Sequence, residues 1–400
     1  MLSPRSAGTV EATLPVVGAA IGEISQVFYR RLFEAHPALL DDLFNRGNQA
    51  TGSQQQALAG SIAAFAGALL AHPDQRPDAM LARIAHKHVS LGITEDQYPV
   101  VHTHLFAAIV EVLGDAVTAE VAAAWDEVYW LMANALIALE RRLYAQAGLT
   151  AGDVWRTYRV VARYQETDDV VTFLVRPADG LPVPEGQPGQ YVSVQVRLPD
   201  GANQIRQYSL SGHPDGALQF SVKRELGEPL GEVSHHLHEN TGVGGALRIG
   251  APSGDVVLGE DDDTPLLLAS AGIGCTPMIS MLGRLAGTGS TRRIIALHGD
   301  RDQTSHPFRS ELGRLTAKLA DAETHVWYER PLGDWPAERT GLVDLNGPGA
   351  VAVPAGTRAY LCGPLPFLRA VRTQLLDAGV RPADIHYEVF GPDLWLQRAG

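Results

Sequence analysis

Apolar residues recur at helical spacing over the first 148 residues of the chain. The first run begins after Ser3-Pro4, a pair typical of a helix N-terminus, and His36-Pro37 ends it. Its apolar positions are Val10, Leu14, Val17, Ile21, Ile24, Phe28 and Leu32. Further helical stretches follow at residues 54–70, 77–91, 97–113 and 118–147. We therefore predict about six helices in residues 1–148, packed as a compact all-α domain.

The pattern changes after residues 148–152, where short β segments replace the helices and Gly/Pro turns separate them. These segments are residues 158–164, 170–175, 190–198, 206–210, 218–223 and 246–249. Closely spaced strands of this kind predict a barrel or a sandwich over residues 152–259. The acidic run at residues 260–263 is most simply a solvated linker.

From Thr264 onward, strands alternate with helices. The strands are residues 266–270, 294–298, 324–328, 359–362 and 385–390, and helices of ten residues or more fit between several of them. This alternation predicts a doubly wound α/β domain with a parallel sheet over residues 264–400.

Composition narrows the class of protein. Of the 400 residues, 45% are hydrophobic and 19% are charged, as in globular proteins with large cores. The formal net charge of −13 argues against nucleic acid and anionic membrane surfaces as main partners. No window approaches the ~20 apolar residues that a membrane span needs, so we expect no integral membrane association.

The two cysteines, Cys275 and Cys362, both lie inside apparent functional motifs. A disulfide framework is therefore not expected, and a reducing compartment fits. The apolar stretch at residues 14–20 is short and follows Glu11, which favours a helix over a signal peptide. We expect a cytoplasmic protein.

The stretch Arg206-Gln207-Tyr208-Ser209-Leu210 offers a guanidinium, an aromatic ring and a hydroxyl on one strand. Such a set suits a flat, anionic ligand, although an ordinary amphipathic strand explains it equally well alone. A turn and a second aromatic precede it, at Pro188-Gly189-Gln190-Tyr191. A glycine turn that opens a short helix, Gly231-Glu232-Val233-Ser234, follows it and could hold a pyrophosphate. The set resembles the flavin-binding barrel of the ferredoxin–NADP reductase superfamily, in which an Arg-x-Tyr-Ser motif holds FAD.

His88 stands out in the helical domain because it continues the apolar face of Leu81, Ile84 and Ala85, whereas His86 points elsewhere. A lone histidine on such a face is more often a core residue than a ligand. The last helix places a carboxylate, Glu140, on its own apolar stripe, and a buried carboxylate needs a partner. Tyr98 aims a phenol inward, so Glu140 and Tyr98 could orient His88 from behind.

These three residues lie where the first 148 residues resemble a bacterial globin, and the whole chain resembles flavohaemoglobin, the nitric oxide dioxygenase family. By that resemblance His88, in Lys87-His88-Val89-Ser90, is the iron ligand of haem b, and Tyr98 and Glu140 are its proximal partners. Tyr29 matches the distal tyrosine that hydrogen-bonds bound dioxygen. The match also implies three haem-pocket residues besides Lys87, namely Phe44, Gln54 and Leu58. From the residues alone, core packing is the simpler reading of Tyr29 and Phe44.

A second resemblance concerns the nicotinamide site. Ala269-Ser-Ala-Gly-Ile-Gly-Cys-Thr-Pro277 follows an apolar strand and opens a helix, so a pyrophosphate can approach its backbone N–H groups. By the match, the nicotinamide dinucleotide binds at Gly272, Ile273, Gly274, Cys275, Thr276 and Pro277 and at Cys362, Gly363 and Pro364. Tyr191 joins the Arg206–Ser209 set at the flavin, and Phe390, followed by Gly391 and Pro392, covers it. Two positions depart from the family: Cys275 stands where Gln is frequent, and Val389 where Cys is frequent.

The resemblance implies an enzyme that passes electrons from NADH or NADPH through FAD to haem, where NO and O₂ become nitrate. The cofactors are then haem b, FAD and NADH or NADPH, and we expect a monomer. A flavohaem reductase of another acceptor, such as a hydroperoxide or free flavin, stays open, as does a haem-based oxygen sensor or carrier. Asp300 could bind a ribose diol, whereas Arg301 and Arg309 could hold a 2′-phosphate, so the sequence favours NADH only slightly.

Overall fold

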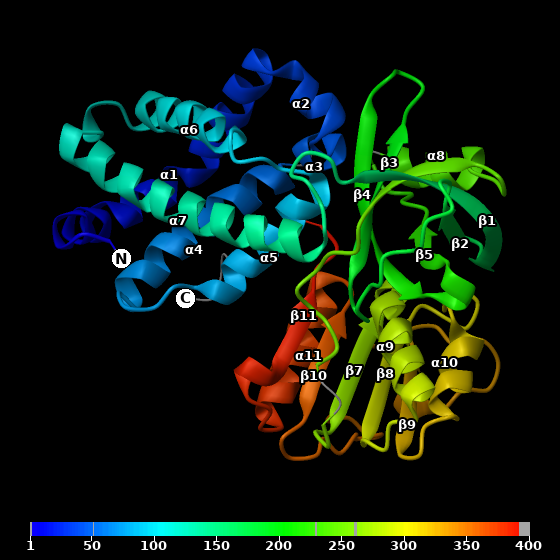
Figure 1. The fold of residues 1–400 in the computed structure, drawn as a ribbon. Helices are drawn as coiled ribbons and strands as arrows, with labels where there is room; N and C mark the ends of the chain where they lie inside the picture. The colour runs from blue at the N-terminus through cyan, green and yellow to red at the C-terminus, as the bar shows by residue number, and fades with distance from the viewer. Residues whose placement is uncertain (1, 51, 229, 260–261, 392–400) are drawn as a thin grey trace. The chain divides into compact units, whose positions relative to one another are not determined.

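The computed structural model describes residues 2–50, 52–228, 230–259 and 262–391, drawn in colour in Figure 1. Two compact units divide the described residues. The first unit comprises the chain up to Trp155, the segment Gln195–Arg206 and Gly391, and the second comprises Arg156–Val194 and Gln207–Phe390. Residues Gln195–Arg206 therefore group with the helices. The boundaries of the three expected domains stay a prediction.

The described part of the first unit contains five long helices, as the apolar spacing predicts. They are α1 (Pro4–Ala35), α4 (Ser53–Ala71), α5 (Asp78–Leu91), α6 (Gln97–Leu113) and α7 (Ala119–Gln146). The Ser3 hydroxyl accepts the Ser6 N–H and so caps α1, and His36 ends that helix. Two short helices, α2 (Pro37–Asp42) and α3 (Arg46–Ala50), lie in the stretch where no helix was expected.

The core of the helical part forms where α1 packs on α4, α6 and α7 and where α5 packs on α7. Its fully buried side chains include Ile24, Leu32, Phe65 and Leu81. The Trp125 indole is also buried and donates to the Thr13 hydroxyl at 3.0 Å, which satisfies its polar edge. None of the described helices is long and apolar enough to span a membrane.

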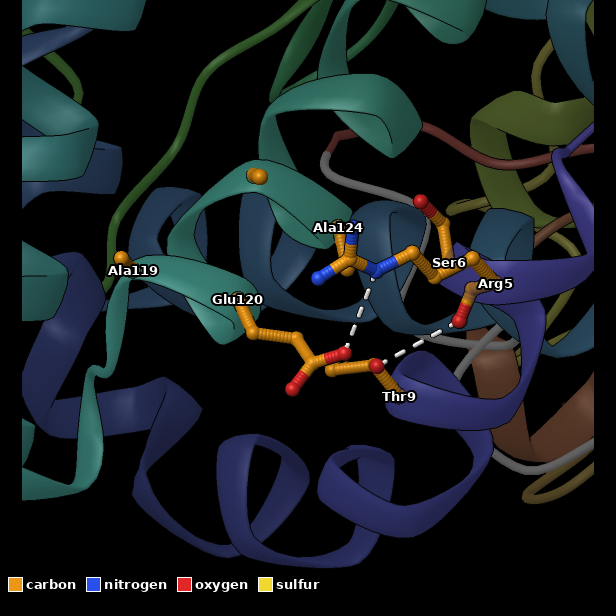
Figure 2. A pocket seen from close by; sticks show the side chains of 7 residues that line it. Arg5, Ser6, Thr9, Ala119, Glu120 and Ala124 are labelled. Atoms are coloured by element: carbon orange, nitrogen blue, oxygen red, sulfur yellow. Dashed lines mark hydrogen bonds and ion pairs between the residues drawn. The ribbon is translucent and has the colours of Figure 1, made fainter.

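A pocket of about 220 Å³ opens where the first turns of α1 and α7 meet (Figure 2). The Arg5 guanidinium pairs with Glu120 at 3.3 Å, and the Thr9 hydroxyl donates to the Arg5 carbonyl. No residue that we expected at a cofactor site lines this pocket.

Six strands close into a barrel in the order β1-β2-β5-β4-β3-β6, which decides between the barrel and the sandwich that the strand spacing left open. They are β1 (Trp155–Thr167), β2 (Val170–Pro177), β3 (Tyr191–Arg197), β4 (Asn203–Gly212), β5 (Leu218–Lys223) and β6 (Ala246–Gly250), and α8 (Glu232–Asn240) precedes β6. The pairing of β1 with β2 is antiparallel and shifts register twice, between Val160 and Ala162 and between Gln165 and Thr167. Such bulges bend a long strand, as barrel closure requires.

The α/β part contains a parallel sheet in the order β11-β10-β7-β8-β9. Its strands are β7 (Leu266–Ala271), β8 (Ile294–Asp300), β9 (Ala322–Tyr328), β10 (Arg358–Cys362) and β11 (Ile385–Glu388), connected through α9 (Cys275–Thr288), α10 (Arg309–Thr316) and α11 (Leu365–Asp377). The central strands are buried on both faces, which explains their unbroken apolar runs. Strand order reverses between β7 and β10, and ligands of such sheets bind where the order reverses.

The acidic run before β7 is more than a solvated linker. The Asp262 carboxylate lies 3.1 Å from the Arg292 guanidinium, whose side chain is 2% exposed, and 3.6 Å from that of Arg358. A buried guanidinium needs a counter-charge, so Asp262, which is exposed as expected of a linker, also pairs with Arg292. Glu260 and Asp261 lie outside the described residues.

Candidate functional site

Three elements of the helical part bring together His88, Tyr98 and Glu140. His88 Nδ1 lies 2.7 Å from Glu140 Oε1, and the Tyr98 hydroxyl donates to the same oxygen at 2.5 Å. The Tyr98 hydroxyl is also 3.1 Å from His88 Nδ1. His88 comes from the last turn of α5, Tyr98 from the first turn of α6 and Glu140 from α7, so helix packing assembles the group.

The environment determines the protonation of this group. Burial, followed by the charge of Glu140, raises the pKa of Tyr98 well above its usual range, so the phenol keeps its proton and donates. With Nδ1–H donated to the carboxylate, the lone pair of His88 lies on Nε2, which has no hydrogen-bond partner among the described residues. The His88 side chain stays 31% exposed, although its partner Glu140 is almost fully buried. An imidazole anchored through Nδ1 with its Nε2 open fits an iron ligand of haem.

Aromatic rings gather around Tyr29 on α1. Its ring lies 4.8 Å from that of Phe28, 5.6 Å from that of Phe33 and 5.7 Å from that of Phe44. Tyr29 is 4% exposed, and Phe44 packs against the same core. The structure therefore brings together Tyr29 and Phe44, two of the residues that the globin resemblance assigns to the haem pocket.

The other expected haem-pocket residues, Leu58, Lys87 and Gln54, lie on α4 and α5. Leu58 packs against the helical core from α4. Lys87 is half-buried on α5, next to His88. The side chain of Gln54 lies outside the described residues. Their roles at a haem stay predictions.

The flavin motif lies on β4. Arg206, Gln207 and Tyr208 are half-buried, whereas Ser209 is 5% exposed and Leu210 is fully buried. The Tyr208 ring stacks on Phe220 at 5.6 Å, and the Gln207 amide donates to the Ser193 hydroxyl at 3.1 Å. A half-buried guanidinium beside an aromatic ring that stacks on Phe220 fits the phosphate and the ring system of a flavin dinucleotide.

Tyr191 begins β3 and exchanges both backbone hydrogen bonds with Ser253, at 2.8 and 2.9 Å. A Cβ added at Gly254 would lie 3.3 Å from two carbons of the Tyr191 ring. Phe390 is 46% exposed, and Gly391 follows it with a φ of 120°. Pro392 lies outside the described residues, so the predicted cover of the flavin stays a prediction.

The two nicotinamide motifs meet backbone to backbone at the switch point. Gly272–Gly274 forms one turn between β7 and α9, and Cys362 ends β10. A Cβ on Gly274 would lie 2.3 Å from the Cys362 carbonyl oxygen and 2.8 Å from the Gly363 nitrogen. Gly363 has a φ of 157°, and a Cβ there would lie 2.9 Å from Phe367. Only glycine permits this approach, and it leaves the start of α9 next to the loop after β10.

The other residues of the two nicotinamide motifs lie where α9 and α11 begin. Thr276 is buried, and its hydroxyl donates to the Ile273 carbonyl at 3.0 Å. Pro277 is buried in the first turn of α9, where its missing N–H costs nothing, and Pro364 directly precedes α11. An N-terminus shaped in this way fits the pyrophosphate of a nicotinamide dinucleotide.

The unusual Cys275 is fully enclosed. Its Sγ lies 3.7 Å from the Pro307 carbonyl oxygen, and burial raises the pKa of its thiol far above the ordinary value. The Cys362 thiol is likewise buried with a raised pKa. Both are therefore neutral packing groups at neutral pH rather than reactive thiolates.

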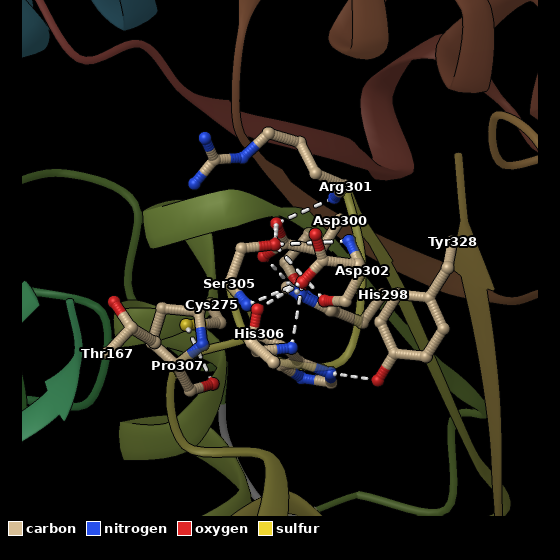
Figure 3. A network of polar contacts seen from close by, with 12 residues as sticks. Thr167, Cys275, His298, Asp300, Arg301, Asp302, Ser305, His306, Pro307 and Tyr328 are labelled. Carbon is tan, nitrogen blue, oxygen red and sulfur yellow. Dashed lines mark hydrogen bonds and ion pairs between the residues drawn. The ribbon is translucent and has the colours of Figure 1, made fainter. Parts of the chain in front are cut away.

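A buried polar network follows β8 and holds the loop beside Cys275 (Figure 3). The rings of His298 and His306 stack 3.8 Å apart. His298 Nδ1 pairs with Ser270 Oγ at 2.9 Å, and His306 Nδ1 with the Tyr328 hydroxyl at 2.9 Å. Burial, followed by His298, lowers the pKa of His306 to about 2, so the ring is neutral.

Asp300, which the sequence offered as one possible ligand of a ribose diol, belongs to the same network. Its Oδ1 accepts the Ser305 hydroxyl at 2.7 Å and the Arg301 N–H at 2.7 Å, and its Oδ2 lies 3.4 Å from His298 Nε2. The side chain is 5% exposed. Arg301 and Arg309 are exposed, and in Figure 3 the Arg301 guanidinium extends away from the network. The slight preference for NADH that rested on Asp300 stays a prediction.

Sequence reasoning missed Gln204, which is fully buried on β4, and the stacked pair His298–His306. Two signals pointed toward the pair: His298 ends an apolar strand, and His306 precedes Pro307 at the start of a helix. Gln204 offered no signal, because an isolated Gln in a strand is usually exposed.

Comparison with known proteins identifies the family. Residues 26–136 match the globin family, and residues 268–373 match the oxidoreductase NAD-binding domain family. A flavohemoprotein of Rhizobium meliloti is 41% identical over 99% of this chain and 100% of its own length. A flavohemoprotein of Bordetella pertussis is 42% identical over 98% of this chain and 99% of its own.

Two solved structures are similar to this chain, one over nearly its whole length and one over part of it. The crystal structure of flavohemoglobin from Malassezia yamatoensis with bound FAD and heme superposes with a TM-score of 0.86, at 38% identity, over 98% of this chain and 100% of that one. The flavohem-like FAD/NAD binding domain of nitric oxide dioxygenase from Vibrio cholerae has a TM-score of 0.54 at 37% identity, over 59% of this chain and 99% of its own. The globin match, the NAD-binding match and the full-length identities together show that this chain belongs to the flavohemoprotein family.

Proposed function

We propose that this protein is an NAD(P)H-dependent nitric oxide dioxygenase that carries haem b and FAD and converts NO and O₂ to nitrate. The observation that carries the proposal is the His88–Tyr98–Glu140 group, in which a buried carboxylate holds the imidazole from behind. An anionic partner of this kind makes a ligating imidazole more electron-donating, which favours activation of bound oxygen over its storage. The Vibrio cholerae domain, from a protein named nitric oxide dioxygenase, supports the same activity.

The residues divide into three tasks. His88 Nε2 would bind the iron, while Glu140 and Tyr98 keep the proton on Nδ1. The Tyr29 hydroxyl, enclosed by aromatic rings, would donate a hydrogen bond to the oxygen substrate. When bound, the haem supplies the reaction site, and FAD takes a hydride from the nicotinamide and releases its electrons singly.

The residues of the barrel and of the α/β part would order the other two cofactors. Arg206 would meet the flavin phosphates, and Tyr191, Tyr208 and Ser209 would contact its rings and heteroatoms. The Gly272–Pro277 turn and the Cys362–Pro364 turn would hold the nicotinamide dinucleotide, because their glycines leave backbone N–H groups open to a phosphate. The small-molecule partners are then NO, O₂ and NADH or NADPH.

The test supplies the haem- and FAD-loaded protein with NADH or NADPH in air, and follows NO with an electrode and nitrate by ion chromatography. Rapid NO loss with matching nitrate is expected. Tyr29→Phe should release O₂ faster and lower NO turnover roughly ten- to a hundredfold, because a hydrogen bond to a charged group is worth about 1.5–3 kcal/mol. Reduction of the flavin by the nicotinamide should not change in this variant.

The matched control is Tyr144→Phe. Tyr144 is also buried in the helical part, and its hydroxyl donates to the Ile93 carbonyl at 2.7 Å. It should keep native NO turnover. If the loaded native protein consumes NADH in air but makes no nitrate from NO, the proposal fails and a reductase of another acceptor, such as a hydroperoxide, takes its place.

A further inference from the structure

Gln204 is a fully buried amide within the first unit. It lies on β4, two residues before Arg206, and its side chain reaches the segment that connects α2 to α3. Its Nε2 donates to the carbonyl oxygens of Leu40 at 3.2 Å, Asp41 at 3.1 Å and Phe44 at 3.2 Å. Its Oε1 accepts the Arg46 N–H at 3.2 Å.

These contacts satisfy the ends of two short helices. Leu40 and Asp41 lie in the last turn of α2, where backbone carbonyls have no partner inside the helix. Arg46 begins α3, so its N–H belongs to the first turn, whose donors find no acceptor inside the helix and take one from elsewhere. A single side chain therefore caps the end of one helix and the start of the next, and the turn that carries Phe44 lies between them.

Glutamine is suited to this position because its amide both donates and accepts. A carboxylate of the same size has no N–H and would place a negative charge beside three carbonyl oxygens. An apolar side chain would remove all four of these hydrogen bonds, which the buried amide atoms of Gln204 now make. Ion pairs and side-chain contacts flank the amide: Arg46 lies 2.7 Å from Asp200, and the Asn203 amide donates to Asp42 at 2.8 Å.

The same amide also contacts the proposed flavin site. The Arg206 guanidinium donates to Gln204 Oε1 at 3.4 Å and to the Ile205 carbonyl at 2.8 Å. Gln204 thus touches, through one planar group, the backbone of the proposed haem-pocket residue Phe44 and the side chain of the proposed phosphate ligand Arg206.

We propose that Gln204 is a positioning residue for electron transfer, because it holds the turn that carries Phe44 and the strand that carries Arg206 in one geometry. This inference rests on the proposed function, since it assumes haem beside Phe44 and flavin beside Arg206. Gln204 itself exchanges no electron or proton. Its loss allows the turn and the strand to move relative to each other, which slows the passage of electrons from flavin to haem.

The experiment compares native protein with Gln204→Leu, both loaded with haem and FAD. Hydrogen–deuterium exchange reports on the Arg46 amide, and stopped-flow spectroscopy separates reduction of the flavin by NADH from reduction of the haem by the flavin. We expect roughly tenfold faster exchange at Arg46, as the loss of its hydrogen bond to Gln204 Oε1 implies. Haem reduction should slow roughly tenfold or more, while flavin reduction and CO binding to reduced haem keep native rates.

Two further variants test whether the effect is specific to Gln204 and to its donor group. Gln219→Leu is the matched control, because Gln219 is a half-buried glutamine of β5 whose amide donates to the Ser211 hydroxyl at 3.0 Å. It should leave both readouts native. Gln204→Glu keeps the acceptor oxygen for Arg206 but has no donor for the carbonyls, so FAD retention should stay native while haem reduction slows.

Native haem reduction in Gln204→Leu, with or without faster exchange at Arg46, overturns the inference, because the residue is then at most a helix cap. Equal slowing in Gln219→Leu also overturns it. Failure of the proposed function is distinguishable from either result: the native protein would then retain no haem or no flavin, or would form no nitrate.

Discussion

Replacing Glu140 with Gln should raise the midpoint potential of the haem. The carboxylate is 3% exposed and accepts from both His88 Nδ1 and the Tyr98 hydroxyl. Iron in its oxidised state withdraws electron density from the imidazole and makes Nδ1–H a stronger donor. The anionic acceptor therefore stabilises the oxidised state more than the reduced one. A neutral amide has nearly the same shape and can still accept Nδ1–H, so the packing of α5 on α7 is retained.

The magnitude follows from the 2.7 Å contact between His88 Nδ1 and Glu140 Oε1. A hydrogen bond to a charged group contributes about 1.5–3 kcal/mol, roughly twice a neutral bond. A one-electron couple shifts by about 59 mV for each tenfold change in equilibrium constant, or about 1.4 kcal/mol. If most of the bond strength is gained in the oxidised state, the potential rises by about 60–130 mV. The gain is not screened by solvent, because the carboxylate is buried.

Spectroelectrochemical titration of the haem band measures this shift directly. Glu120→Gln is the matched control: Glu120 lies on the same helix, but its carboxylate is exposed and pairs with Arg5 at the surface, so the potential should not move. A Glu140→Gln protein that binds haem in full and keeps the native potential, or lowers it, would refute the argument that the carboxylate acts through the imidazole.

Three further predictions concern other parts of the chain. His88→Ala should lose stable haem ligation while His86→Ala keeps it, as the absorption spectrum after gel filtration will show; equal loss in both contradicts the assignment. Gly274→Ala should weaken NADH binding at least about tenfold in a fluorescence titration, because its Cβ would lie 2.3 Å from a backbone oxygen, whereas Gly287→Ala, with open space around its Cβ, should bind normally. Finally, His306 has a pKa lowered to about 2 from an unfolded value of 6.5, so its contribution to stability is complete above about pH 6.5 and falls by about 1.4 kcal/mol per pH unit below it. Urea denaturation at about pH 7.5 and about pH 5.5 should show this loss of unfolding free energy in the native protein and a smaller loss in His306→Gln. Equal losses in the two proteins would contradict the prediction.

The sequence alone determined the classes of structure in this chain. Helical periodicity and the Ser3-Pro4 start marked the long helices, and apolar runs followed by Gly-rich turns marked the parallel strands. The phase of α5 distinguished His88 from His86, and the stripe of α7 placed Glu140 inward. These signals are visible because they depend on local geometry, in which the spacing of residues along one element decides which face they share.

Only the tertiary structure decided which separated residues meet. The contact between Gly274 and Cys362 depends on the strand order that places β10 beside β7. The ion pairs of Asp262 and the stacking of His298 on His306 have no periodic signal either. Gln204 is the clearest case, since its partners lie about 160 residues earlier in the chain. A buried amide depends on the groups that surround it in space, and these are known only once the strand has been placed against the turn.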